Sequence, residues 1–394
     1  MRPSRLLRRA APTAAALAAL SLPLAAQQRD QPARGTVNDR YTLRGDRIAV
    51  YNLVGTMRVE GASRGGDVEA EVRVGGPDGK ELRVETGDIR GRQTLRVIYP
   101  DDDIRVDRDA DFSGSTTLYV RADGTFGDGG GRDSDDDQDW NSDRNSRSRR
   151  RGSDDAPSGG RGRRVRIGTR GSGIEAYADV TLRVPEGRTV AVYLGVGEAT
   201  VSNVNGDLLV DVAAAGITTE RTRGHLRLDT GSGSVSVTDA QGDVDLDSGS
   251  GGVRVRNVKG KTLRIDTGSG SVTADGVDVE NLDVDVGSGG VRLTNVTAPD
   301  LHVDSGSGSV DVELASGATA RDYLFDTGSG GVTLRVPSTF AGDLDISTGS
   351  GGITTELPIA VTRRDRTSLR GRIGEGGGRI KIDTGSGGVR LLKN

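Results

Sequence analysis

The chain has 394 residues, of which 61 are glycine and only 3% are aromatic. Conventional globular cores bury much aromatic surface, so this composition favours thin layers of Val, Leu and Ile. The absence of cysteine excludes disulfides, thiolate metal sites and a lipid-modified cysteine. Two histidines are too few to favour a histidine zinc site.

Residues 1–26 have the pattern of an export signal. Four arginines among the first nine residues precede an apolar run at 14–24, and Ala25 and Ala26 suit cleavage after Ala26. The run is shorter than the ~20 residues that span a bilayer, so we predict a signal peptide and no transmembrane anchor. Removing it leaves 49 basic and 57 acidic residues, a net charge of −8, which disfavours nucleic-acid binding. The mature protein is predicted to be periplasmic, cell-surface or secreted.

Residues 27–121 contain several runs of alternating apolar and polar residues, which are typical of β-strands. We predict that this N-terminal region forms either the first coils of a repeat array or a β cap on it. Residues 122–163 have almost no apolar side chains and are acidic at 128–143 and basic at 144–151. That composition predicts a disordered charged insertion. A solvated loop without function is the simplest interpretation, although Trp140 or the arginine run could dock a partner.

Residues 164–394 carry the clearest signal, a repeated Gly-Ser-Gly motif. Successive copies follow one another at a nearly constant spacing, except for a longer final step that we attribute to an irregular turn around residues 363–378. The first glycine of each copy is at 231, 249, 268, 287, 306, 328, 349 and 385. Degenerate copies at 194–200 and 211–217 extend the array upstream.

Each repeat reads as two or three short strands separated by glycine corners. In the unit 242–259, Val244 and Leu246 alternate with aspartates, and Val253 and Val255 alternate with arginines. Such a unit cannot bury its apolar face alone, but stacked units can. We therefore predict an all-β fold, a parallel and right-handed β-helix of about 19-residue coils. The competing interpretations are an antiparallel meander or propeller, and a flexible Gly-Ser linker.

Charged residues recur at fixed positions of the repeat. One row is an aspartate ladder formed by Asp211, Asp229, Asp247, Asp266, Asp285, Asp304 and Asp326. Two residues before each ladder aspartate, opposite charges alternate at Arg227, Asp245, Arg264, Asp283 and His302. Stacking in register would make these opposite charges neighbours and would penalise a slip by one coil.

Aspartates stacked at ~4.8 Å repel, so something must compensate. We favour hydrogen bonds from the backbone N–H groups of the following Thr-Gly-Ser turn to each carboxylate. The alternative is Ca²⁺ bridging Asp229, Asp247, Asp266, Asp285, Asp304 and Asp326, although known calcium β-helix repeats place aspartate after the glycines. No other cofactor is predicted.

Asp-Thr-Gly-Ser at 229, 266, 326 and 383 resembles the active-site loop of aspartic proteases. That chemistry needs two aspartates facing each other, whereas one motif per coil gives a single file. No Ser-His-Asp set is supported, and the sequence predicts no catalytic residue. We therefore predict a non-enzyme.

The repeats as a set resemble the bacterial putative-adhesin family, a domain of unknown function built from β-strand repeats. The resemblance covers about residues 40–110 and 164–394, and the insertion departs from it. It is carried by residues 52–55, 181–187, 206–211, 242–247, 371–380 and 383–389 together with the Asp-Thr-Gly-Ser-Gly series. It implies an exported β-helical fold, a role in adhesion or at the envelope, and no catalytic residues.

We thus expect a surface or secreted binding module whose partner is a cell-surface glycan or protein. A periplasmic scaffold without an external ligand is the alternative. A polysaccharide-acting β-helix enzyme is the least favoured, because the uniform repeats show no cleft with clustered acids and bases.

Overall fold

The computed structural model describes residues 37–62, 65–106, 114–127 and 162–394, all within one compact unit, residues 33–394. The predicted signal peptide and most of the predicted insertion lie outside the described residues. Most secondary structure in the described residues is β-strand. The one helical element among them is a short 3-10 turn, η1 (Gly79–Glu81). Among these residues no helix has the length and apolar character needed to cross a bilayer.

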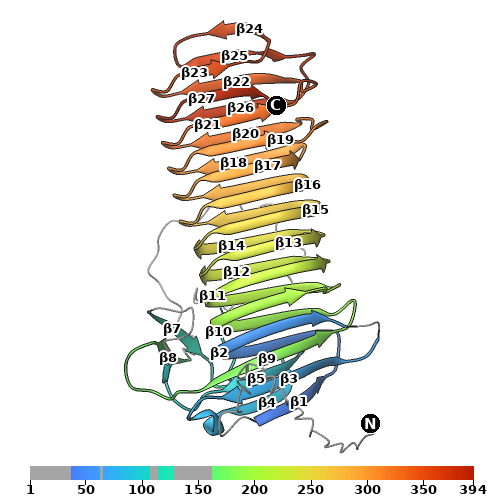
Figure 1. The fold of residues 1–394 in the computed structure, drawn as a ribbon, viewed down its shortest axis with the longest axis vertical. Coiled ribbons are helices and arrows are strands. Elements are labelled where there is room, and N and C mark those ends of the chain that lie inside the picture. Colours follow the sequence, from blue (N-terminus) through green and yellow to red (C-terminus); the bar gives the residue numbers. More distant parts are fainter. Residues whose placement is uncertain (1–36, 63–64, 107–113, 128–161) are drawn as a thin grey trace, which may run out of the picture. The chain divides into compact units, whose positions relative to one another are not determined.

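Twenty-four strands form one continuous sheet wound into stacked coils (Figure 1). Neighbouring coils pair in parallel and advance by one repeat at a time, with Leu208 opposite Leu226, Leu226 opposite Val244, and Val244 opposite Leu263. This confirms the all-β repeat fold and contradicts the antiparallel meander and the linker interpretation. The coils contain β10 (Thr189–Ser202), β11 (Asp207–Arg223), β12 (Leu226–Ser232), β13 (Val235–Gln241), β14 (Val244–Ser250), β15 (Val253–Thr267), β16 (Val272–Val286), β17 (Val291–Thr297), β18 (Asp300–Ser305), β19 (Val310–Leu314), β20 (Asp322–Thr327) and β21 (Val332–Val336).

The core runs through the inside of the coils as layers of aliphatic side chains. In the coil formed by β12 and β13, Leu226, Leu228, Val235, Val237 and Ala240 are buried, whereas residues such as Arg227 and Asp229 face outward. Period-two alternation on a stacked sheet has this result. One corner of several coils has a left-handed backbone, with φ between 53° and 56° at Asn203, Arg221, Asp239, Asn257 and Asn295. Asn and Asp tolerate this conformation better than most residues.

Glycine is abundant because the corners stack backbone on backbone. A Cβ atom at Gly289 would clash with the carbonyl oxygen of Gly270, one coil below. The same clash recurs between Gly308 and Gly289, and between Gly330 and Gly308. The second glycine of each motif is therefore required by the close approach of neighbouring coils.

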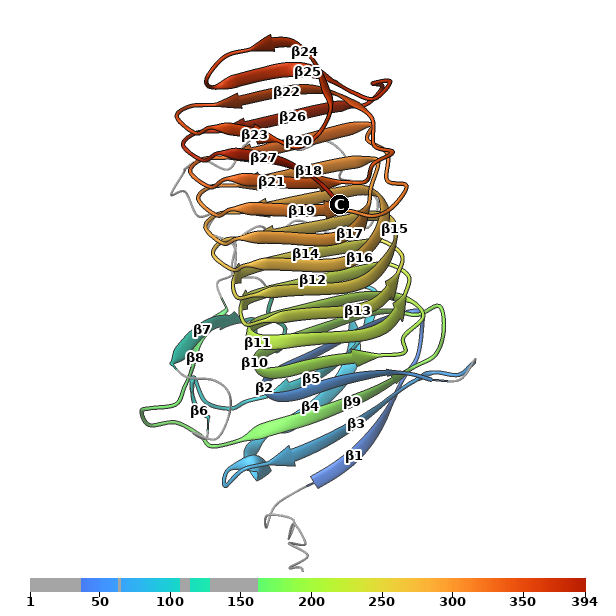
Figure 2. The same cartoon turned by 45° about the horizontal axis from the view of Figure 1, so that its top comes forward.

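At the C-terminal end the coils do not follow sequence order. The strands there are β22 (Gly342–Thr348), β23 (Ile353–Thr355), β24 (Ile359–Arg364), β25 (Ser368–Ile373), β26 (Arg379–Thr384) and β27 (Val389–Lys393). β26 pairs in parallel with β20 on one side and with β22 on the other, so the last coil lies between two earlier ones. β25 then pairs antiparallel with the free edge of β22, and β24 pairs with β25 (Figure 2).

The predicted irregular turn around residues 363–378 is therefore wrong. The long final step of the repeat contains an antiparallel hairpin of β24 and β25 and a return of the chain past one coil. A single repeat motif carries no signal for which coil it will contact, so the sequence pattern alone could not reveal this.

The N-terminal end is also interleaved. Its strands are β1 (Val37–Leu43), β2 (Arg47–Gly61), β3 (Val68–Gly75), β4 (Arg83–Ile89), β5 (Arg92–Ile98) and β9 (Tyr177–Val184). β2 forms a complete coil against β10, and its other edge pairs with β5 along its first half and with β9 along its second half. β1, β3 and β4 add antiparallel pairs beyond this layer. The region thus contains both a coil and a cap.

A small separate sheet covers the coil of β2 and β10. It consists of β6 (Asp103–Arg105), β7 (Ser115–Val120) and β8 (Arg163–Gly168). A Cβ atom at Gly195 of β10 would lie 2.9 Å from Leu118 and 3.1 Å from Ile167, which places this sheet against the coil. The ends of the predicted insertion are among the described residues: Thr125 and Phe126 are buried, and Arg163 begins β8.

Candidate functional site

The aspartate ladder runs along one outward row of the stacked coils. The pairing register places consecutive members opposite each other from Asp211 to Asp326, as the repeat predicts. The last coil, formed by β26 and β27 and inserted between two earlier coils, adds a further member to the ladder. We call it the inserted coil; its Asp383 lies opposite Asp326. Sequence analysis omitted Asp383 from the ladder, although its Asp-Thr-Gly-Ser motif was a usable signal.

Both ends of the ladder are closed by other residues. The residue beyond Asp383 in this row is Ser347, and the residues beyond Asp211 are Tyr193 and then Tyr51. The two tyrosine rings stack at a centroid distance of 4.5 Å and an interplanar angle of 3°, and Phe126 packs edge-on against Tyr51 at 5.8 Å. Burial raises the pKa of both tyrosines, so they are neutral hydroxyls at physiological pH.

Repulsion between neighbouring carboxylates contributes to the raised pKa of two aspartates in the middle of the ladder. Burial, followed by the charges of Asp304 and Asp283, raises the pKa of Asp285. Burial, followed by the charges of Asp326 and Asp283, raises the pKa of Asp304. The row is therefore a strip of negative potential that would be relieved by protonation or by a cation.

At several corners a Thr or Ser hydroxyl group stabilises the turn that follows the aspartate. Thr267 accepts a hydrogen bond from Gly270 N at 3.2 Å, and Ser305 accepts one from Gly308 N at 3.0 Å. The Thr327 hydroxyl donates to the Gly330 carbonyl at 2.5 Å. These hydroxyl groups point into the coil and bridge its corner, while the aspartates face outward.

The backbone N–H group of the first glycine in several motifs already donates a hydrogen bond to the neighbouring coil. Gly268 N donates to Ser248 O at 3.0 Å, Gly287 N to Thr267 O at 2.9 Å, and Gly306 N to Val286 O at 3.0 Å. These bonds join neighbouring coils, so these groups cannot also neutralise the preceding carboxylates. The proposed compensation by turn N–H groups fails at these glycines.

The second charged row stacks as predicted. Arg227 lies opposite Asp245, Asp245 opposite Arg264, Arg264 opposite Asp283, and Asp283 opposite His302. The row next to the ladder thus alternates in sign, and the Arg264 charge lowers the pKa of Asp285 against the larger effects that raise it. Alternation of charge in this row offsets part of the repulsion along the ladder and favours this register.

The calcium hypothesis gains no geometric support. Across the part of the chain that the structure describes, no three Asp, Glu or His side chains converge as a metal site would require. The ladder carboxylates form a single file, and bridging by Ca²⁺ stays a prediction to be tested in solution.

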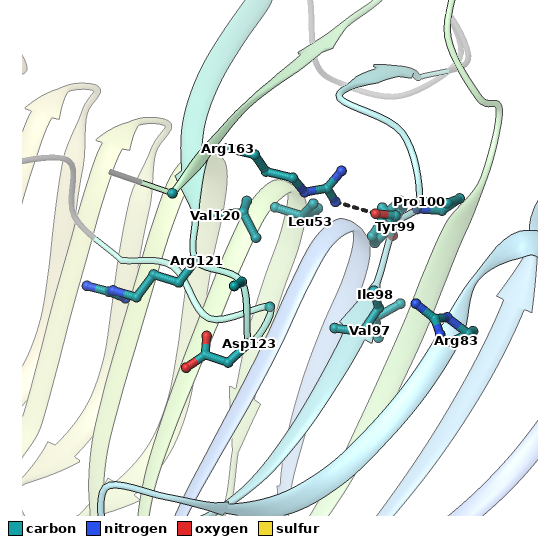
Figure 3. Close-up of a pocket in the computed structure, with 13 residues that line it drawn as sticks. Leu53, Arg83, Val97, Ile98, Tyr99, Pro100, Val120, Arg121, Asp123 and Arg163 are labelled. Carbon is teal, nitrogen blue, oxygen red and sulfur yellow. Dashed lines mark hydrogen bonds between the residues drawn. The ribbon is translucent and has the colours of Figure 1, made fainter. Parts of the chain in front are cut away.

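A second candidate site is a cavity of about 750 Å³ beside the described ends of the predicted insertion (Figure 3). Leu53, Val97, Ile98 and Val120 give it apolar walls, and three arginines also line it. Arg163 donates to the Tyr99 carbonyl and to Asp102 at 2.8 Å, and Arg121 donates to Thr125 at 3.4 Å. These two guanidinium groups are held by neighbouring loops, which suits a structural role. No sequence pattern pointed to this cavity, because its walls come from five separate segments of the chain.

The family profile described as Toastrack DUF4097 matches residues 161–392, more than half of the chain. The chain belongs to the Toastrack DUF4097 family. Among solved structures, a chain described as a putative cell adhesion protein from Clostridium sporogenes aligns with 91% of this chain and 100% of its own length, at 7% identity. Its TM-score of 0.19 is too low to establish a shared fold. Comparison with curated proteins gave no match.

Proposed function

We propose that this Toastrack DUF4097 chain is an exported, non-catalytic binding module of the cell envelope. The observation that supports this proposal is the arrangement of the ionisable groups, which lie in straight rows over one face of the sheet. Catalysis requires groups that converge on one reacting atom, whereas rows at a fixed spacing suit a repetitive or extended partner. A cell-surface glycan or a protein is such a partner.

The acidic ladder restricts the partner's chemistry. A strip of stacked carboxylates attracts cationic groups and repels polyanions, so nucleic acid is not an expected ligand. The alternative role, a periplasmic scaffold without an external ligand, shares the same fold and differs in location. We also infer that the coils wind right-handed, as parallel crossovers almost always do.

Location can be tested by treating intact cells with trypsin and probing for the protein. By sequence, the insertion offers cleavage sites at Arg144 and Arg147, whereas the stacked coils should resist. Cleavage on intact cells would support the surface module. Protection until the outer membrane is opened would favour the periplasmic scaffold and contradict adhesion.

A further inference from the structure

The C-terminal coil, residues 379–394, is integrated with strands that lie far from it in the sequence. β26 and β27 pair with β20 and β21 on one side and with β22 and β23 on the other. Ile380, Ile382, Val389 and Leu391 are each at most 1% exposed. This segment fills a slot whose two walls are separate from it along the chain.

Polar contacts specify the occupant of the slot. Arg379 forms a two-pronged ion pair with Asp322 at 2.7 and 2.8 Å, and Asn394 Nδ2 donates to the Leu314 carbonyl at 2.8 Å. Tyr323 and Phe325, both fully buried, lie opposite Ile380 and Ile382. The slot therefore selects a parallel strand with Arg first and isoleucine at alternate positions.

The covalent connection of this coil to the rest of the molecule is a glycine hinge. Residues 374–378 read Gly-Glu-Gly-Gly-Gly, with positive φ at Gly374, Gly376 and Gly377. The hinge passes from β25, on the outer side of β22, to β26 on its inner side. It thus crosses two strand spacings, about 9.6 Å.

We propose that the slot between the β20–β21 and β22–β23 coils also accepts residues 379–394 of a second copy of this chain, which yields a reciprocally strand-exchanged dimer. Every contact of the closed monomer is kept in such an exchange, and only the hinge changes. The partner is a second copy because the slot's ion pair and core match this segment's own sequence. The dimer would join two aspartate ladders in one assembly.

Deletion of residues 374–377 in the full chain tests the proposal. Only Gly378 then links Ile373 to Arg379, and two Cα steps span at most ~7 Å, too short to reach the chain's own slot. We expect a larger dimer fraction than in the parent chain, measured by light scattering after size exclusion. The matched control inserts two glycines after Gly377 and should not raise the dimer fraction above that of the parent. A shortened chain that is monomeric and as trypsin-resistant as the parent would overturn the proposal.

A second measurement decides the matter if the shortened chain fails to fold. A protease site is placed in the hinge, the folded protein is nicked, and it is unfolded and refolded with an excess of labelled peptide 378–394. Incorporation of the peptide supports the exchange, and the same peptide carrying Ile380→Asp and Ile382→Asp serves as the control. Failure of the native peptide to replace the nicked segment would contradict it.

Discussion

The central coils and the two ends of the stack are built from the same repeat but are connected differently. Between β11 and β18, each coil pairs with the coil that follows it directly in the sequence. At the C-terminal end β26 pairs with β20, which places Ile380 opposite Tyr323, and the β22–β25 segment lies between them in the chain. At the N-terminal end Val192 of β10 lies opposite Val50 of β2, although β3 to β9 intervene in the sequence.

The difference has an energetic consequence. The sequence separation of Val50 and Val192, paired residues of β2 and β10, is roughly eight times that of paired residues in neighbouring central coils. Closing a flexible segment of that length costs about 2 kcal/mol more in chain entropy. The ends recover this cost by covering the edges of the sheet, which would otherwise expose unpaired backbone groups. Each end also finishes in antiparallel strands, which interrupt further parallel stacking.

The largest expected effect on stability comes from comparing a core substitution in the inserted coil with one in a central coil. Ile382→Asp buries an uncompensated carboxylate and should cost about 4 kcal/mol or more. Because the β22–β25 region is held through β26, we expect residues 338–394 to lose hydrogen-exchange protection while residues 207–305 keep theirs. Ile265→Asp, in a central coil, should instead disrupt the middle of the stack. A uniform loss of protection in Ile382→Asp would show that the ends and the centre unfold as one unit.

The next effect concerns the glycine corners. Gly289→Ala places a methyl group against the Gly270 carbonyl and should destabilise the protein by about 3 kcal/mol. The adjacent Gly290→Ala meets its nearest neighbour, Ser309 O, at 3.6 Å and should change stability by less than about 0.5 kcal/mol. Gly351→Ala and Gly352→Ala repeat the pair at the C-terminal end. Equal melting temperatures for the two members of a pair would argue against backbone contact at the corners.

A smaller effect, on the pH dependence of stability, distinguishes the aspartate ladder from the Arg379–Asp322 ion pair of the inserted coil. The pKa of Asp304 is raised in the folded state, first by burial and then by its neighbours, so protonation stabilises the fold and this benefit is lost as pH rises through the folded pKa. Asp304→Asn should therefore raise stability by about 0.5 kcal/mol at pH 7, with the gain disappearing near pH 3.

The control has the opposite sign. The Arg379 hydrogen bond lowers the pKa of Asp322, so its contribution is present above the unfolded pKa and is lost as pH falls. Asp322→Asn should cost a few tenths of a kcal/mol at pH 7 and nothing at low pH. Urea unfolding across this pH range checks both signs, and a destabilised Asp304→Asn at pH 7 would contradict the repulsion in the ladder.

The smallest expected effect is that of calcium. Because the described carboxylates form a file and do not converge, we expect melting temperatures in CaCl₂ and in EDTA to agree. A substantial drop in EDTA that is lost in Asp285→Asn would instead establish the bridging ions that the sequence suggested.

The sequence determined the repeat fold and the site rows because both depend on local periodicity. Alternation such as Val244, Leu246 and the intervening aspartates decides which side chains are buried, and the nearly constant repeat length decides the register of Asp247 with its neighbours. The same period placed Arg264 between Asp245 and Asp283.

Only the tertiary structure decided the order of the coils at the ends. Residues 379–393 have the same alternation as any other coil, so periodicity alone fits an inserted position as well as a final one. Two contacts that no repeat motif encodes select the inserted position. β25 occupies the outer edge of β22, and Arg379 pairs with Asp322 of β20. Asp383 joins the ladder beside Asp326 for this reason. The cavity near Arg163 likewise arises because strands distant in sequence meet around Tyr99.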